Sequence, residues 1–397
     1  MTGVKIVEVA SWTFVPSGGA ILADLGADVI KVEPPTGDPQ RGLKNLLNRD
    51  AGGVNPFLEV PNRGKRSISL DLTSEGGYEI LCQLVATADV FVTSSLPSIC
   101  AKLRITVDDV RAMNPNVIYA RGSGWGTTGP MAETAGFDLA AAWASCGLAA
   151  HLTPPGGEPP MQPSAFFDLQ GGAMIASAIS AALFARERTG EPSEVDVSLL
   201  NVGMWAMSQG IVGAVNAHAT QPPPDRFNPG NPLVNWYRTA DGRWLYLVLL
   251  QADRYWAELC RFLDCPDLVD DPRFNNATVR HEHRREFVEA LDEVFATKTM
   301  EEWKQVLEGF SGVWAPVLRL DELHSHPQVD ANGFLPHLTD NAGTPFRIVA
   351  SPMQFDRTPT TPQGPAPEVG QHTEDILLEL GFDWDQIGEA RQRGVLG

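Results

Sequence analysis

Short apolar runs alternate with segments of helical spacing along the first third of the chain. The runs are typical of buried strands and the periodic segments of amphipathic helices. Predicted strands lie at 4–10, 28–35, 66–72, 89–94 and 117–123, and predicted helices at 18–27, 76–88 and 107–115. This alternation indicates an α/β fold, with a parallel sheet and helices on both of its faces.

A break in composition divides the rest of the chain. A small-residue helix is predicted at about 170–187, and the proline-rich residues 221–235 indicate a linker. A hairpin and a charged helical region follow, so we expect a small α+β domain at 236–330. The large domain is expected to span 1–220 and to be completed by 331–397.

The charge balance excludes some classes of function. Among 397 residues, 49 are acidic and 30 basic, which gives a net charge of −19. This argues against a partner with a phosphate backbone or an anionic membrane, but not against a small anionic ligand. The five cysteines include no CxxC motif, and the longest clean apolar run, 173–185, is short for a membrane span. We expect a soluble cytoplasmic protein with reduced thiols and without a signal peptide.

Asp168 is the sharpest candidate for chemistry. It follows two phenylalanines and precedes Gly171 and Gly172 at the start of the small-residue helix. One interpretation is a helix cap. The other is a carboxylate nucleophile or acid–base group near a helix N-terminus, with the two glycines letting a bulky thioester approach the backbone.

Other motifs have less specific interpretations. The glycine-rich segment 121–130 suits a substrate-lining loop or a tight turn better than a dinucleotide site, because its spacing is GxGxG. Arg63, Lys65 and Arg66 form a dense basic cluster, which suits either phosphate binding or a solvated turn. The histidine pairs have poor spacing for a metal, and no metal site is expected.

Taken in order, several segments resemble the class III CoA-transferase family, which includes formyl-CoA transferase, carnitine CoA-transferase and α-methylacyl-CoA racemase. The segments are ADLGADVIKVEPPTGD (23–38), NRGKRSISLDL (62–72), NVIYARGSGWGTTGP (116–130), AGFDLAAAWASCG (135–147), FFDLQGGAMIASAISAALFARERTGEPSEVDVSLLN (166–201), YRTADGRWLYL (237–247), APVLRLDEL (315–323) and GQHTEDILLELGFDWDQI (370–387). The resemblance implies a Rossmann-like large domain built from both chain ends, a smaller inserted domain and an interlocked homodimer.

The same resemblance implies a mechanism. Asp168 matches the family's catalytic aspartate, which carries CoA as an aspartyl-CoA thioester between an acyl-CoA donor and a carboxylic acid acceptor. A CoA thioester is then a substrate, and no permanently bound cofactor is needed. Expected contacts to substrate or CoA are Thr13, Arg41, Arg63, Lys65, Arg66, Leu70, Lys102, Arg104, Trp125, Phe137, Asp138, Gly171 and Gly172.

Some positions depart from the family pattern. The racemase branch has a histidine where this chain has Phe137, which cannot carry a proton. Pro34, Thr13 and Thr73 stand where relatives have Arg, Gln and Lys. A racemase or isomerase and a non-catalytic CoA-binding protein therefore remain alternatives. Six aromatic residues are candidates for an apolar acyl pocket, and half of them are expected to be core instead: Trp12, Phe14, Trp125, Phe137, Trp143 and Phe167.

Overall fold

The computed structural model describes residues 1–43, 53–219 and 222–397. The chain divides into two compact units. Unit 1 contains residues 1–153, 158–221 and 327–397, and unit 2 contains residues 154–157 and 222–326. Both ends of the chain therefore belong to unit 1.

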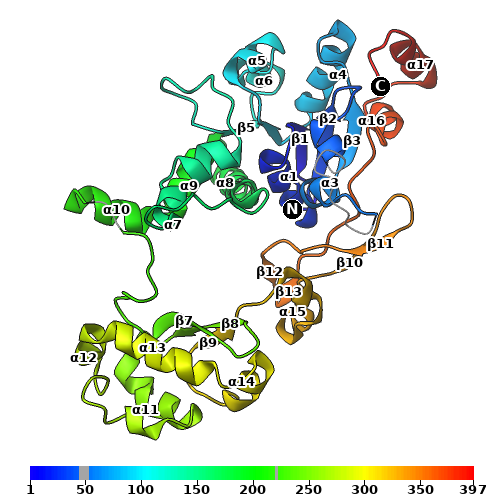
Figure 1. The fold of residues 1–397 in the computed structure, drawn as a ribbon. Coiled ribbons are helices and arrows are strands. Elements are labelled where there is room, and N and C mark those ends of the chain that lie inside the picture. The colour runs from blue at the N-terminus through cyan, green and yellow to red at the C-terminus, as the bar shows by residue number, and fades with distance from the viewer. Residues whose placement is uncertain (44–52, 220–221) are drawn as a thin grey trace. The chain divides into compact units, whose positions relative to one another are not determined.

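A six-stranded parallel sheet organises unit 1 (Figure 1). Its strand order is β3-β2-β1-β4-β5-β6, the order of a Rossmann fold. The strands are β1 (Lys5–Val9), β2 (Asp28–Glu33), β3 (Arg66–Ser69), β4 (Val90–Thr93), β5 (Ile118–Ser123) and β6 (Glu194–Ser198). The first five confirm the strands expected from the sequence, with shorter bounds.

Helices cover both faces of this sheet, as the alternation of strands and helices predicted (Figure 1). The side chains of β1 alternate between two cores: Ile6 enters one and Val7 the other. The first core lies against α1 (Phe14–Asp24), α8 (Phe166–Thr189) and α9 (Leu199–Ala206). The second lies against α4 (Glu75–Ala86), α5 (Pro97–Lys102), α6 (Val107–Met113), α16 (Thr373–Glu379) and α17 (Trp384–Gln392).

The last segment of the chain completes unit 1. Ile376 and Leu377 of α16 and Ile387 of α17 are buried in the second core. Leu396 forms a β-bridge with Leu70, just beyond the end of β3. The C-terminal residues thus cover one face of the sheet, as the resemblance implied.

α1 and α8 pack closely because glycines line their crossing. A Cβ atom on Gly172 would lie 1.9 Å from Ser17 Oγ and 2.9 Å from Gly18 N, and one on Gly171 would lie 2.5 Å from the Phe14 ring. α8 is the one helix in the described part of the chain with the length and composition to span a membrane. Its packing in the first core accounts for that composition equally well.

The remaining elements of unit 1 are short. They are η1 (Pro39–Gly42), α3 (Pro56–Asn62), η2 (Leu139–Ala144), α7 (Leu148–Leu152), α10 (Ser208–Ala217), α15 (Pro327–Ala331), β10 (His337–Thr339), β11 (Pro345–Arg347), β12 (Gln354–Phe355) and β13 (Thr358–Pro359). β10 pairs with β11 and β12 with β13, both antiparallel.

Unit 2 has an antiparallel sheet of β7 (Val234–Arg238), β8 (Trp244–Val248) and β9 (Trp314–Pro316). β7 and β8 form the hairpin expected around Asp241 and Gly242. The other elements are α11 (Ala252–Phe262), η3 (Pro266–Leu268), α12 (Ala277–Glu282), α13 (Arg284–Phe295), α14 (Met300–Val306) and η4 (Leu320–Ser325).

Part of the predicted linker belongs to unit 2. Leu233 is fully buried in the core of this unit, and Arg226 forms an ion pair with Asp292 at 2.6 Å. Prolines occur in packed loops as well as in flexible linkers, so the proline content of this segment does not by itself indicate a flexible linker. Residues 220–221 lie outside the described residues.

Candidate functional site

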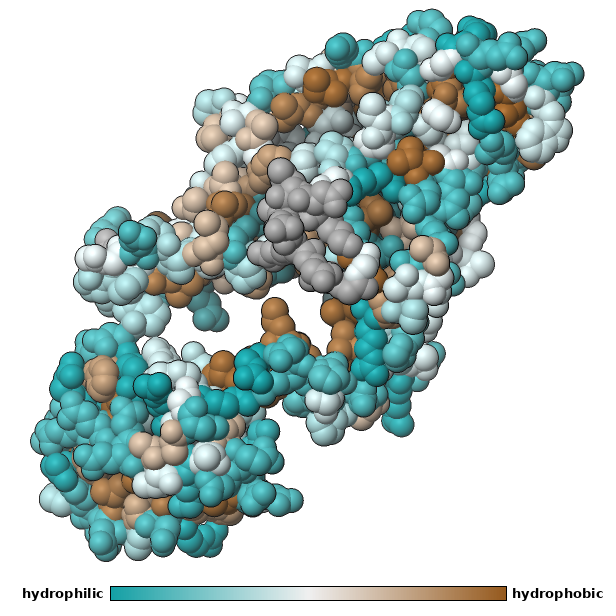
Figure 2. Space-filling model, turned by 45° about the vertical axis from the view of Figure 1, so that its right-hand side comes forward, coloured by the Kyte–Doolittle hydropathy of each residue, from teal (hydrophilic) through white to brown (hydrophobic). Residues whose placement is uncertain are grey.

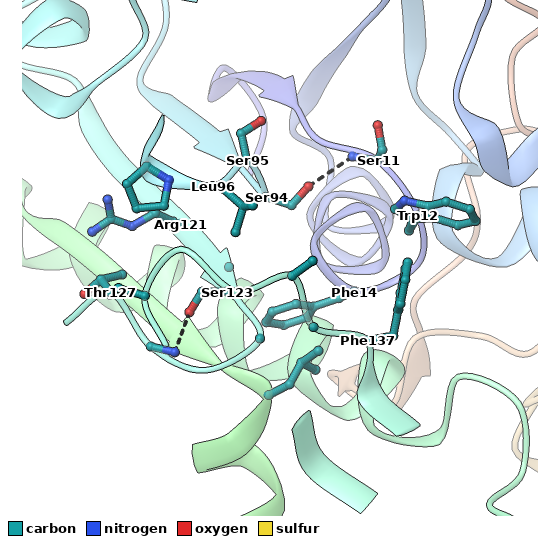
Figure 3. A pocket seen from close by; sticks show the side chains of 18 of the residues that line it. Ser11, Trp12, Phe14, Ser94, Ser95, Leu96, Arg121, Ser123, Thr127 and Phe137 are labelled. Carbon is teal, nitrogen blue, oxygen red and sulfur yellow. Dashed lines mark hydrogen bonds between the residues drawn. The ribbon is translucent and has the colours of Figure 1, made fainter. Parts of the chain in front are cut away.

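A pocket of about 190 Å³ opens at the carboxyl ends of β1, β4 and β5 (Figure 3). The chain order of the sheet reverses between β1 and β4. In open α/β sheets this reversal leaves a crevice where ligands bind. All residues that line the pocket belong to unit 1.

Asp168 lines this pocket from the first turn of α8. The helix begins four residues earlier than the sequence suggested, after Ala165 in a left-handed conformation. Within the described ranges, no hydrogen bond or ion pair to the Asp168 carboxylate is found. Burial, and secondarily the negative charge of Asp138, raise the pKa of Asp168 to about 7. The carboxylate is therefore unusually basic and open to the pocket.

Asp138, not Asp168, caps α8. Its Oδ2 accepts a hydrogen bond from the Phe167 amide at 3.2 Å, and the residue is buried. The capping interpretation of Asp168 is therefore wrong. Because the Asp138 carboxylate accepts the hydrogen bond at the helix N-terminus, the Asp168 carboxylate can react without breaking a bond that holds the helix.

One wall of the pocket is aromatic. The rings of Trp12 and Phe137 meet edge to face at 5.3 Å, and Phe14 also lines the pocket beside Phe137 (Figure 3). Phe137 is 54% exposed, in contrast to Trp143 and Phe167, which are buried in the first core. Trp125 is not among the lining residues, and its indole N–H donates to the Ala135 carbonyl. Three of the six aromatic candidates thus line the pocket, and one of these, Phe14, also packs in the first core.

The facing wall is polar, and sequence reasoning missed most of it. The Ser94 hydroxyl accepts a hydrogen bond from the Ser11 amide, and the Ser123 hydroxyl accepts one from the Gly126 amide (Figure 3). Ser95 and Arg121 complete this wall. These residues lie at the ends of predicted strands, and this position could have identified them as site residues. The inference also requires the order of the strands in the sheet, which the sequence does not reveal.

The glycine-rich loop lines the pocket, as expected for a substrate-lining loop. Gly122, Gly124, Gly126 and Thr127 all contribute. The expectation that Gly171 and Gly172 let a thioester approach the backbone is wrong, however. Both are buried against α1, so they serve helix packing and do not face a thioester.

Two of the expected phosphate ligands are inside the protein. Lys65 Nζ lies 2.7 Å from Glu8 Oε1, and Arg63 Nη2 lies 2.8 Å from Asp24 Oδ2. Burial lowers the pKa of Lys65 to about 8. Both interpretations of these two residues, phosphate binding and a solvated turn, are therefore wrong. The sequence did not reveal the buried ion pairs because the partner carboxylates come from elements far away in the sequence.

Other expected contacts also lie away from the pocket. Leu70 is buried in the second core, and the Thr13 hydroxyl accepts a hydrogen bond from buried Gln40. The role of four other cationic side chains as phosphate ligands stays a prediction.

Three of these side chains form ion pairs and one is exposed: Arg41 pairs with Glu33, Arg66 with Asp28 and Glu379, and Arg104 with Glu75, while Lys102 is exposed at the end of α5.

No group of three or more metal-ligating side chains occurs in the described part of the chain. The pocket therefore offers a basic carboxylate, an aromatic wall and a polar wall. This set suits attack on an activated carbonyl carbon.

A comparison of the sequence with family models decides the family. Residues 1–373 match the model of CoA-transferase family III. The chain belongs to CoA-transferase family III.

The family's members act on chemically different acids. The chain is 31% identical to (R)-2-hydroxy-4-methylpentanoate CoA-transferase of Clostridioides difficile, over 100% of this chain and 99% of that protein. It is 32% identical to succinate–glutarate CoA-transferase of Agrobacterium fabrum, over 96% of this chain and 95% of that protein. The fold is shared with a CaiB/BaiF family protein from Brucella suis, with a TM-score of 0.83 at 28% identity, over 96% of this chain and 98% of that one. This protein is accordingly an enzyme of the CoA-transferase type, with CoA thioesters as substrates.

Proposed function

We propose that this protein transfers CoA from an acyl-CoA donor to a carboxylic acid acceptor through a covalent intermediate on Asp168. The observation that carries the proposal is the basic, unpaired carboxylate of Asp168 in the pocket at the strand-order reversal. A carboxylate with a raised pKa is a better nucleophile once it is ionised.

The proposed chemistry exchanges one thioester for another. An Asp168 oxygen attacks the donor thioester carbon, and the C–S bond breaks to give a mixed anhydride and CoA thiolate. The thiolate attacks the Asp168 carbonyl carbon and releases the donor acid, which leaves an aspartyl-CoA thioester. The acceptor carboxylate then attacks this thioester, and the thiolate takes the acceptor's acyl group from the resulting anhydride. Asp168 is restored, and the energy of the thioester is conserved throughout.

The rate of intermediate formation is expected to rise with pH through about 7. Asp168 must be ionised to attack, and the pKa of its carboxyl is raised to about 7, so activity is low below this value and levels off above it. Asp138→Asn keeps an oxygen for the Phe167 amide but removes the negative charge. The midpoint of the pH–rate profile should then move to lower pH, whereas Asp108→Asn, in the first turn of α6, should leave it in place. An unmoved midpoint in the Asp138 variant would contradict the assigned role of that charge.

The acyl group is proposed to be branched or aromatic. Trp12, Phe14 and Phe137 offer an apolar wall, and the relative from Clostridioides difficile is named for a branched hydroxy acid. No histidine lines the pocket in the described ranges, and Phe137 stands where the racemase branch has one.

An exchange assay tests the proposal. The protein is incubated with one acyl-CoA and a panel of branched, aromatic and dicarboxylic acids, without ATP or added metal, and the new acyl-CoAs are separated by chromatography. We expect transfer, with the branched or aromatic acids preferred. CoA binding without transfer to any acid would favour the non-catalytic alternative. Solvent deuterium at the acyl α-carbon without an acceptor would favour a racemase.

We further propose that a second copy of the chain covers the exposed apolar residues of α8, α9 and α10, among them Phe184, Trp205 and Val215. Apolar residues reach the surface in several places on the face shown in Figure 2. Large apolar side chains exposed together on neighbouring helices are typical of protein interfaces.

Gel filtration should therefore give a dimer. Trp205→Glu should release monomers, because it places a charge at a residue that is 70% exposed in the single chain and buried in the proposed dimer. Trp384→Glu is the matched control, since Trp384 is 65% exposed on α17. Native protein that elutes as a monomer would contradict the proposal.

A further inference from the structure

Two cysteines meet at the C-terminal end of α11 in unit 2. The helix ends at Phe262, and Asp264 takes a left-handed φ of 56°. The Cys265 amide donates to the Cys260 carbonyl at 2.9 Å, and the Asp264 amide donates to the Arg261 carbonyl at 3.3 Å. These two bonds define a Schellman motif, in which the side chains at the positions of Cys260 and Cys265 frequently contact each other.

The two thiols differ in surroundings. Cys260 is fully buried in the core of unit 2, and Cys265 is partly exposed. The interaction between the two thiols lowers the pKa of Cys265, and the same interaction, together with burial, raises the pKa of Cys260. The negative charge of Asp264 opposes the shift of Cys265, and the cation of Arg280 favours a thiolate at Cys260. Cys265 is thus the more accessible and more acidic thiol of the pair.

The other cysteines have different surroundings. The Cys82 thiol lies near Tyr78, and the Cys100 sulfur accepts a hydrogen bond from the Tyr119 hydroxyl at 3.9 Å. Burial raises the pKa of both thiols and also that of Cys146. These thiols are therefore expected to react more slowly with an oxidant.

We propose that Cys260 and Cys265 form a dithiol site at which peroxides oxidise this protein to an intramolecular disulfide. The Cys265 thiolate attacks one oxygen of hydrogen peroxide, the O–O bond breaks, and a sulfenic acid and hydroxide result. The Cys260 thiol then attacks the Cys265 sulfur, which forms the S–S bond and releases water. The Schellman motif places the two residues together at the end of α11, so the second thiol can reach the first without unfolding of the helix.

Peptide mapping of the full-length protein tests this site. The protein is treated with hydrogen peroxide, alkylated and digested without reductant. We expect a linked peptide pair containing Cys260 and Cys265, a mass loss of two hydrogens and reversal by dithiothreitol. Cys265→Ser should abolish the link, and Cys82→Ser should leave it unchanged. In Cys260→Ser, dimedone should trap a sulfenic acid at Cys265.

Alkylation of Cys260 and Cys265 after peroxide treatment would overturn the proposal, as would preferential oxidation of Cys82, Cys100 or Cys146. The readout is chemical and does not require CoA transfer. Its failure is therefore distinguishable from failure of the proposed function.

Discussion

Asp168→Asn is expected to lower CoA transfer by at least about 10³-fold while the protein stays folded. The substitution keeps the shape of the side chain but removes the attacking oxygen anion. No structural bond of the native carboxylate is lost among the described residues, because Asp138 holds the end of α8. The measurement compares the rate of acyl exchange in the variant and the native protein, with far-UV circular dichroism to confirm the fold.

Asp108→Asn is the matched control for this prediction. Asp108 also lies in the first turn of a helix of unit 1, but it is exposed and does not line the pocket. Its variant should retain native activity. Exchange at a near-native rate in a folded Asp168→Asn protein would refute the nucleophilic role.

Glu8→Gln is expected to destabilise the protein by about 3–5 kcal/mol, because it leaves buried cations without their shared counter-charge. Glu8 lies on β1 and is fully buried, with Lys65 Nζ at 2.7 Å and Lys31 Nζ at 3.3 Å. In this variant Lys31 keeps its ion pair with Asp38 at 2.9 Å and its hydrogen bond to the Ala10 carbonyl at 2.7 Å. The loss of negative charge therefore affects Lys65 more than Lys31. Urea unfolding, followed by circular dichroism, gives the change in the free energy of unfolding.

Glu75→Gln provides the comparison. Glu75 pairs with Arg104 at 3.2 Å, but both side chains are largely exposed, so the loss is expected to be about 0–1 kcal/mol. Equal losses in the two variants would show that burial of the Glu8 cluster contributes nothing to stability.

The sequence predicted the elements of unit 1 well because each is a local pattern. Apolar runs marked β1, β2 and β4, and the order of strands and helices indicated a parallel sheet. Boundaries were less accurate. α8 begins at Phe166 rather than near 170 because Asp138, 29 residues before Phe167, caps its first turn, and no local pattern shows such a partner.

The candidate site was predicted in part. Asp168 and Phe137 line the pocket, as proposed from their motifs. Ser94 was missed because its place beside Ser11 depends on β4 pairing with β1 across more than 80 residues. Lys65 was misassigned for the same kind of reason: a basic cluster looks like a surface until its partner, Glu8, is brought to it by the sheet.

Mass spectrometry of the digested protein is the most direct test of the central claim. The protein is mixed with an acyl-CoA in the absence of acceptor acid, quenched and digested. We expect a mass gain of one CoA less one water on the peptide that contains Asp168, and no gain in Asp168→Asn. A CoA adduct on another residue, or acyl exchange at full rate without any adduct at Asp168, would contradict it.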